Sequence, residues 1–99
     1  MKVVITAAAK RDLIGIADYI RPHNPGRAAS FVEELLDHCQ TLADLPLRHP
    51  LVPRFERHGV RWCVHADYLI FYGVRMELVE VIHIPHSARD YEALLFPDH

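Results

Sequence analysis

The 99-residue sequence has few of the residues from which common catalytic motifs are built. It contains only four glycines, and they lie too far apart to form a glycine-rich phosphate loop or a nucleophile elbow. Its two cysteines, Cys39 and Cys63, cannot make a paired Cys-x-x-Cys zinc motif. In a cytosolic protein a structural disulfide is not expected, so we interpret both as small apolar packing residues. We expect neither a metal nor another cofactor.

Positive charge is also scarce. Eleven Lys and Arg residues face 13 Asp and Glu residues, which gives a formal net charge of −2 with His neutral. Proteins that bind polyphosphate chains mostly carry a positive excess, so we expect no direct DNA binding by this chain alone. No apolar run reaches the roughly 20 residues of a membrane helix, and the N-terminus has no signal-peptide pattern. We therefore expect a cytoplasmic protein with one domain over residues 1–99 and no membrane partner.

The chain is organised around residues 61–85, where aromatic and β-branched residues dominate. Two short polar breaks divide this stretch into three strand-length runs, which predicts an antiparallel meander. Residues 68–72 are apolar or aromatic without alternation, which indicates a central strand that is covered on both faces. Residues 2–6 form another short β-branched run, and we expect it to add to the sheet.

Two amphipathic helices are predicted before the meander. Residues 7–20 place apolar side chains at three–four spacing, with Thr6 as the N-cap. Asn24 and Pro25 begin a second helix that should run to about Leu45. The expected fold class is α+β: an N-terminal strand, an αα-hairpin on one face of an antiparallel sheet, and a short C-terminal helix or tail.

The second face of this sheet has little apolar sequence to cover it. Residues 47–59 are dense in proline and charge, which predicts a loop with at most an edge strand. Only the apolar patch at residues 94–96 remains. We therefore expect an open apolar face that binds a flexible partner segment, or that joins two copies of the chain in a homodimer.

Histidines and arginines could supply the proton transfer and phosphate binding of a metal-free ribonuclease. The candidates are His65, His83, His86, Arg61, Arg75 and Arg89. Alternatively, Arg61 and Arg89 form ion pairs or cap backbone carbonyls. His83 and His86 would point to opposite faces of a strand, so they do not indicate a metal site.

Several segments, taken in order along nearly the whole chain, resemble the ParE toxins of bacterial toxin–antitoxin modules, within the wider ParE/RelE family. No single segment is specific, but the ordered set is. The segments are residues 9–20 with Asp12-Leu13, Ile16 and Tyr19-Ile20; Asn24-Pro25 with Ala28 and Phe31; residues 42–46; Val60-Arg61; residues 68–72; and residues 82–84 leading to 86–90.

The resemblance implies a toxin that is neutralised by a ParD-like antitoxin in a hetero-oligomer and that inhibits DNA gyrase by binding, without being an enzyme. RelE-like relatives share the fold but cut messenger RNA on the ribosome, and they carry an arginine directly after the tyrosine of the central strand. In this sequence Leu69 follows Tyr68, which favours the ParE branch. In the RelE-like alternative, the catalytic residues would be Arg61, His65 and Arg89.

The resemblance also suggests which residues bind which partner. For the target, the candidates are Arg61, Trp62, Arg89, Asp90 and Phe96. The antitoxin segment should cover the helical hairpin and the sheet edge, with contacts at Leu13, Ile16, Tyr19, Leu36, Tyr68 and Tyr72.

Overall fold

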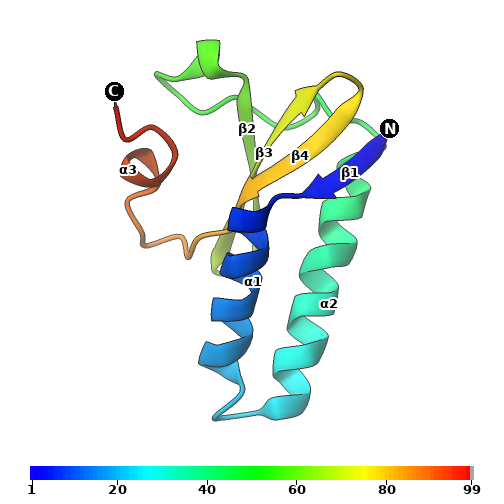
Figure 1. Ribbon diagram of the computed structural model, residues 1–99, viewed down its shortest axis with the longest axis vertical. Helices are drawn as coiled ribbons and strands as arrows, with labels where there is room; N and C mark the ends of the chain where they lie inside the picture. The colour runs from blue at the N-terminus through cyan, green and yellow to red at the C-terminus, as the bar shows by residue number, and fades with distance from the viewer. Residues whose placement is uncertain (99) are drawn as a thin grey trace.

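The computed structural model describes residues 1–98 and confirms the predicted α+β order of elements (Figure 1). A short 3₁₀ turn, Glu56–His58, precedes the meander. The elements are β1 (Lys2–Ile5), α1 (Ala7–Ile20), α2 (Pro25–Thr41), β2 (Val60–His65), β3 (Tyr68–Arg75), β4 (Leu78–His83) and α3 (Tyr91–Leu95).

The four strands form one sheet in the order β1-β4-β3-β2. The antiparallel meander is confirmed, with β3 paired to β2 on one side and to β4 on the other. Met76 and Glu77 both have positive φ and form the tight β3–β4 turn. The N-terminal strand β1 runs parallel to β4, so the sheet is mixed rather than wholly antiparallel. A four-residue run carries no sequence signal for the direction of its pairing.

The helical hairpin begins where the sequence predicts. The Thr6 side chain accepts a hydrogen bond from the backbone N–H of Ala9 at 3.2 Å, and that of Asn24 accepts one from Arg27 at 3.0 Å. The second helix ends at Thr41, earlier than expected. Tight turns follow it up to the proline at position 46, because the residue before a proline avoids the helical conformation. As a result Leu45 is exposed and is not part of the packed stripe.

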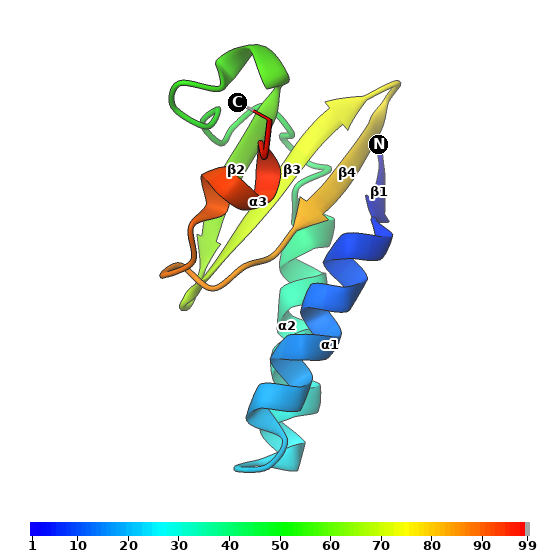
Figure 2. The ribbon, with the colours of Figure 1, turned by 60° about the vertical axis from the view of Figure 1, so that its left-hand side comes forward.

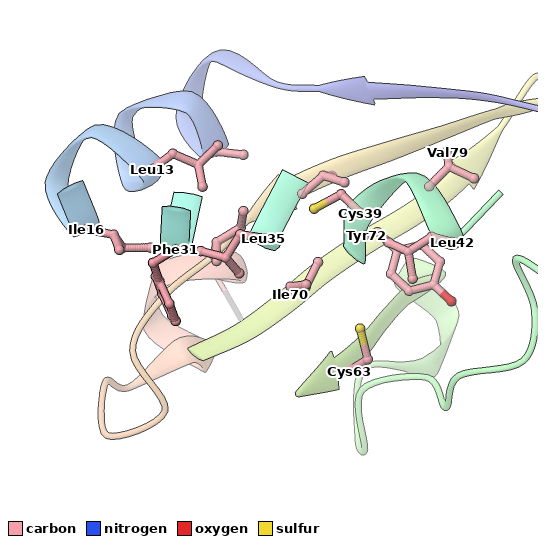
Figure 3. Close-up of a cluster of buried hydrophobic side chains, with 13 residues drawn as sticks. Leu13, Ile16, Phe31, Leu35, Cys39, Leu42, Cys63, Ile70, Tyr72 and Val79 are labelled. Carbon is pink, nitrogen blue, oxygen red and sulfur yellow. The ribbon is translucent and has the colours of Figure 1, made fainter. Parts of the chain in front are cut away.

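The main core lies between the hairpin and one face of the sheet (Figure 3). Ile70 and Tyr72 of β3 point toward the hairpin and are fully buried. The Tyr72 hydroxyl donates a hydrogen bond to the Pro46 carbonyl at 2.7 Å. The hairpin contributes the helical residues Ala9, Leu13, Ile16, Phe31, Leu35 and Cys39 to this core, together with Leu42 directly after α2.

The second face of the sheet is covered, which corrects the expectation of an open apolar face. Leu69 and Phe71 of β3 are buried on this face under a second apolar cluster. The cover comes from α3 and from the proline-rich loop, whose Val52 and Phe55 fold inward. The ring of Phe55 stacks on Phe96 with centroids 4.2 Å apart. This removes the open-face argument for a partner or a homodimer, because Val52 and Phe55 of the loop cover this face together with the C-terminal residues Tyr91, Leu95 and Phe96.

The helical hairpin extends past the edge of the sheet (Figures 1 and 2). In both views its connecting turn lies well beyond the strands, while α3 lies on the other side of the sheet (Figures 1 and 2). The ends of α1 and α2 next to this turn therefore extend past the sheet. Within residues 1–98, no helix is both long and apolar enough to cross a bilayer.

Candidate functional site

Two adjoining hollows lie between the helical hairpin and the sheet. We call them together the notch; Tyr19, Tyr68 and His86 line both hollows. The first has a volume of about 250 Å³ and is also lined by Arg11, Asp12, Gly15, Ile16, Ile84, Pro85 and Arg89. The second has a volume of about 310 Å³ and is also lined by Ile20, Arg27, Phe31, Ala66 and Asp67.

One wall of the notch is fixed by a carboxylate on α1. Asp12 Oδ2 accepts hydrogen bonds from His83 Nδ1 at 2.9 Å and from the backbone N–H of Ile84 at 2.8 Å. Both side chains of this pair are less than one-fifth exposed. Because His83 ends β4, Asp12 holds the chain that leaves the sheet against the hairpin.

The same departing segment is also tied to the start of β3. The backbone N–H of Leu69 donates to the Pro85 carbonyl at 2.9 Å, and that of Ser87 donates to Asp67 at 2.8 Å. The His86 ring meets the Tyr68 ring edge-on, with centroids 5.5 Å apart. Backbone hydrogen bonds therefore hold the base of the notch in place, and the half-buried side chain of Tyr68 forms part of it.

The second hollow combines an aromatic surface with an ion pair at its rim. The Arg27 guanidinium lies 5.1 Å from the Phe31 ring centroid and pairs with Glu34 at 2.5 Å. Burial raises the pKa of Tyr68, and the nearby Tyr19 and Asp67 raise this pKa further. Tyr68 is thus a neutral hydrogen-bonding group at ordinary pH.

Behind this aromatic surface lies a pair of histidines. His38 Nδ1 is 2.8 Å from His65 Nδ1, and His38 Nε2 is 3.8 Å from Cys63 Sγ. The Phe31 ring contacts both the His65 ring, at 5.6 Å, and the Tyr68 ring, at 5.7 Å. The histidine pair therefore supports the notch from behind, linking α2 to the end of β2.

The three residues suggested for a ribonuclease lie in three different settings. Arg61 Nη1 donates to the carbonyls of His49 at 2.7 Å and Leu47 at 3.3 Å, which matches the alternative role of capping backbone carbonyls. His65 pairs with His38, whereas Arg89 lies exposed at the rim of the notch. Arg61 and His65 thus have partners inside the protein, and of the three only Arg89 lines the notch.

The other residues suggested to bind the target serve in packing or in helix capping. Trp62 packs, half-buried, against the apolar cluster on the α3 side of the sheet. Asp90 caps α3 by accepting a hydrogen bond from Ala93 N at 3.3 Å. Phe96 is 7% exposed in the stack with Phe55. Trp62, Asp90 and Phe96 do not line the notch, whereas Arg89 does.

The suggested antitoxin contacts divide by burial. Leu13 and Tyr72 are at most 7% exposed, lie in the core and do not line the notch. Ile16 is 5% exposed in the same core, but it lines the first hollow. Leu36 is half-buried against the core. Tyr19, 65% exposed, and Tyr68 remain as contacts that a bound segment can reach directly.

Sequence reasoning missed Arg11, Asp12 and Arg27 as notch residues. Arg11 and Arg27 look like ordinary solvated helix charges, and nothing local distinguishes them. Asp12 gave a weak signal, because it stands directly beside the apolar stripe of α1.

Neither metal nor thiol chemistry is supported by the side-chain arrangement. Among residues 1–98, no three His, Cys, Asp or Glu side chains lie close enough together to hold a metal ion. Burial raises the pKa of Cys39 to about 12 and that of Cys63 to about 11. Both thiols therefore stay protonated, consistent with their interpretation as packing residues.

The comparisons with known proteins identify the family. The model of the ParE toxin of the type II toxin–antitoxin system parDE matches residues 3–91. The chain belongs to this ParE toxin family. Curated proteins gave no match. ParE-family membership makes the chain a toxin of a toxin–antitoxin module, as the ordered sequence segments suggested.

Solved structures from toxin–antitoxin systems show the same fold. A chain of the chromosomal ParDE system from P. aeruginosa superposes with a TM-score of 0.75 at 20% identity, over 87% of this chain and 95% of that one. A chain of the RelBE2 toxin–antitoxin complex from Mycobacterium tuberculosis gives a TM-score of 0.55 at 25% identity, over 86% of this chain and 95% of that one. Both structures thus share the architecture of this chain.

Proposed function

We propose that this ParE toxin is neutralised by a ParD-like antitoxin, a flexible segment of which fills the notch between the helical hairpin and the sheet. Both solved structures described above come from toxin–antitoxin systems, and one of them is a toxin–antitoxin complex, which supports an antitoxin as the partner. The observation that carries the proposal is the notch itself, a concave surface floored by Tyr68 and rimmed by Tyr19. Grooves of this kind suit an extended or helical peptide segment.

The sheet offers the same segment a place to add a strand. Within residues 1–98, β1 pairs with β4 alone, so its other edge has free backbone groups. The outer edge of β2 is already partly occupied, since Leu51 bridges to Arg61. We therefore expect the antitoxin segment, where it continues beyond the notch, to pair with the free edge of β1.

The antitoxin proposal is tested by co-expressing the toxin with the product of the neighbouring reading frame and scoring growth. Tyr19→Ser should weaken protection, because it removes an exposed ring from the notch. Ile14→Ser is the matched control, since Ile14 is equally exposed on α1, at 61%, but does not line the notch. Equal protection of both variants would place the antitoxin elsewhere.

For the toxic action, we propose inhibition of DNA gyrase by binding, without catalysis. The ParE family model supports this branch. A second support is that Arg61 and His65 are already hydrogen-bonded inside the protein, whereas Arg89 lines the notch. A catalytic ribonuclease needs such groups to converge on one phosphate.

Induction of this chain alone in a bacterium tests the mode of action. Gyrase inhibition should produce the SOS DNA-damage response with intact transcripts, and the purified toxin should block supercoiling by purified gyrase. The observation that speaks for the RelE-like alternative is the likeness to the RelBE2 complex. It would instead give cleaved transcripts without SOS. Healthy cells would contradict both modes of toxic action.

A further inference from the structure

The first hollow of the notch carries two arginines that are not neutralised by the protein. Arg11 on α1 and Arg89 after β4 both line it, and both are exposed. Neither forms an ion pair within residues 1–98, whereas Arg21, Arg27, Arg54 and Arg75 each pair with a carboxylate. The two unpaired arginines come from segments far apart in the sequence, and the fold brings them to one hollow.

The acidic residue in this hollow does not balance them. Asp12 is its sole Asp or Glu among the described residues, and its Oδ2 already accepts hydrogen bonds from His83 and Ile84. The hollow therefore has an excess of positive charge in a chain whose formal net charge is −2. A site of this charge attracts an anion against the average charge of the protein.

The second hollow has a different chemistry. Its apolar surface is formed by Ile20, Phe31 and Tyr68. Its charged lining residues are Asp67 and Arg27, and Arg27 is already paired with Glu34. It suits an apolar side chain, since an aromatic and aliphatic surface gains most from burial. Because Tyr19, Tyr68 and His86 line both hollows, one bound segment can occupy both.

We propose that the notch recognises an acidic-and-apolar peptide sequence. A carboxylate of the antitoxin binds between Arg11 and Arg89, and a neighbouring apolar side chain fills the hollow over Phe31. This rests on the proposed function, and it adds which chemistry the bound segment must have. Arginine suits the site because its guanidinium forms paired hydrogen bonds to a carboxylate.

A peptide fits these features better than a nucleic acid does. An RNA strand would bring a phosphate for every nucleotide, but only two unpaired arginines face the notch. The negative net charge of the chain would then oppose the rest of the strand. A single carboxylate followed by an apolar group matches one charged hollow beside one apolar hollow.

The test uses the full chain and two kinds of probe. The first is the purified protein encoded by the neighbouring reading frame, titrated against the wild type, Arg11→Glu, Arg89→Glu and the double variant. The second is a labelled peptide of alternating Glu and Leu, compared with its Gln–Leu counterpart and with an oligouridine of similar length. Arg57→Glu is the matched control, because Arg57 is exposed, unpaired within residues 1–98 and outside the notch. Circular dichroism confirms folding of each variant.

Each charge reversal should weaken binding of the antitoxin about tenfold or more, and the control should change it less than about twofold. The Glu–Leu peptide should bind better than the Gln–Leu peptide, and this preference should vanish in the double variant. Replacing the contacting acid of the antitoxin with Lys should restore binding to Arg11→Glu or Arg89→Glu.

The outcomes separate the two proposals. If the wild type binds the antitoxin and both Arg11→Glu and Arg89→Glu bind it equally well, the carboxylate site is overturned. The antitoxin proposal then stands. No binding of the antitoxin by the wild type would overturn the proposed function and this inference with it. Oligouridine binding that depends on Arg11 and Arg89, without a preference for the Glu–Leu peptide, would assign the site to RNA.

Discussion

The carboxylate of Asp12, on the first helix, joins the ring of His83, at the end of β4, through a 2.9 Å hydrogen bond. The same oxygen also accepts the backbone N–H of Ile84. One side chain thus holds α1, the end of the sheet and the segment that forms the wall of the notch. Buried groups tied in this way lose more than one hydrogen bond when a partner is removed.

Asp12→Ala should lower the free energy of unfolding by about 1–3 kcal/mol, because it leaves the His83 ring and the Ile84 N–H without their acceptor. Urea unfolding followed by fluorescence of the single tryptophan measures this change. Asp18→Ala is the control: its pair with Arg21 is exposed, and exposed pairs contribute little. Equal losses in both variants would contradict the linking role of Asp12.

Arg61→Gln separates a structural from a target-binding role. We expect a loss of about 1–3 kcal/mol of unfolding free energy, because the charged donor to the carbonyls of His49 and Leu47 disappears. Arg57→Gln should leave stability within about 0.5 kcal/mol, as a surface change does. An Arg61→Gln protein with unchanged urea midpoint but lost toxicity would restore the target-binding interpretation.

The His38–His65 pair should make stability depend on pH. Burial lowers the pKa of His38, and the positive charges of His65, His49 and Arg48 lower it further. The unfolded chain then binds the extra proton more readily than the folded protein, so stability should fall as the pH drops below about 6.5.

The urea midpoint measured from pH 8 to pH 5 in the wild type and in His38→Leu tests this prediction. The slope should be shallower in the variant. Glu34 and Cys63 also lie near the pair and affect its electrostatics. The test therefore compares the slopes of the urea midpoint against pH between the variants and the wild type. His23→Gln, at an exposed position, should keep the wild-type slope. Parallel curves for the wild type and His38→Leu would exclude this pair as the source.

The two thiols should resist alkylation in the folded protein. Cys39 and Cys63 are both buried, and burial raises their pKa values to about 12 and about 11. At pH 8 iodoacetamide should leave the native chain unmodified, because the thiolate is the reactive form. In urea both should react, as read by mass spectrometry. Rapid native labelling of either would show that the core opens locally.

Much of the fold follows from short-range patterns in the sequence. Thr6 and Asn24 cap the helices at the predicted positions, and the unalternated run at residues 68–72 is the central strand. The meander also follows, since its turns are local. These features depend on side-chain period, capping and turn chemistry, which neighbouring residues determine by themselves. The family was recognisable for the same reason, because its elements recur in order.

The tertiary structure decided what the local patterns could not. Only in the folded chain does Val52 cover the second sheet face, β1 run parallel to β4, or Arg11 line the same hollow as Arg89. Asp12 meets His83 across 71 positions of sequence. Such contacts depend on how far the hairpin extends past the sheet and on where the segment after β4 passes α1. A single sequence fixes the period of each segment, but the relative placement of segments comes from packing all of them at once.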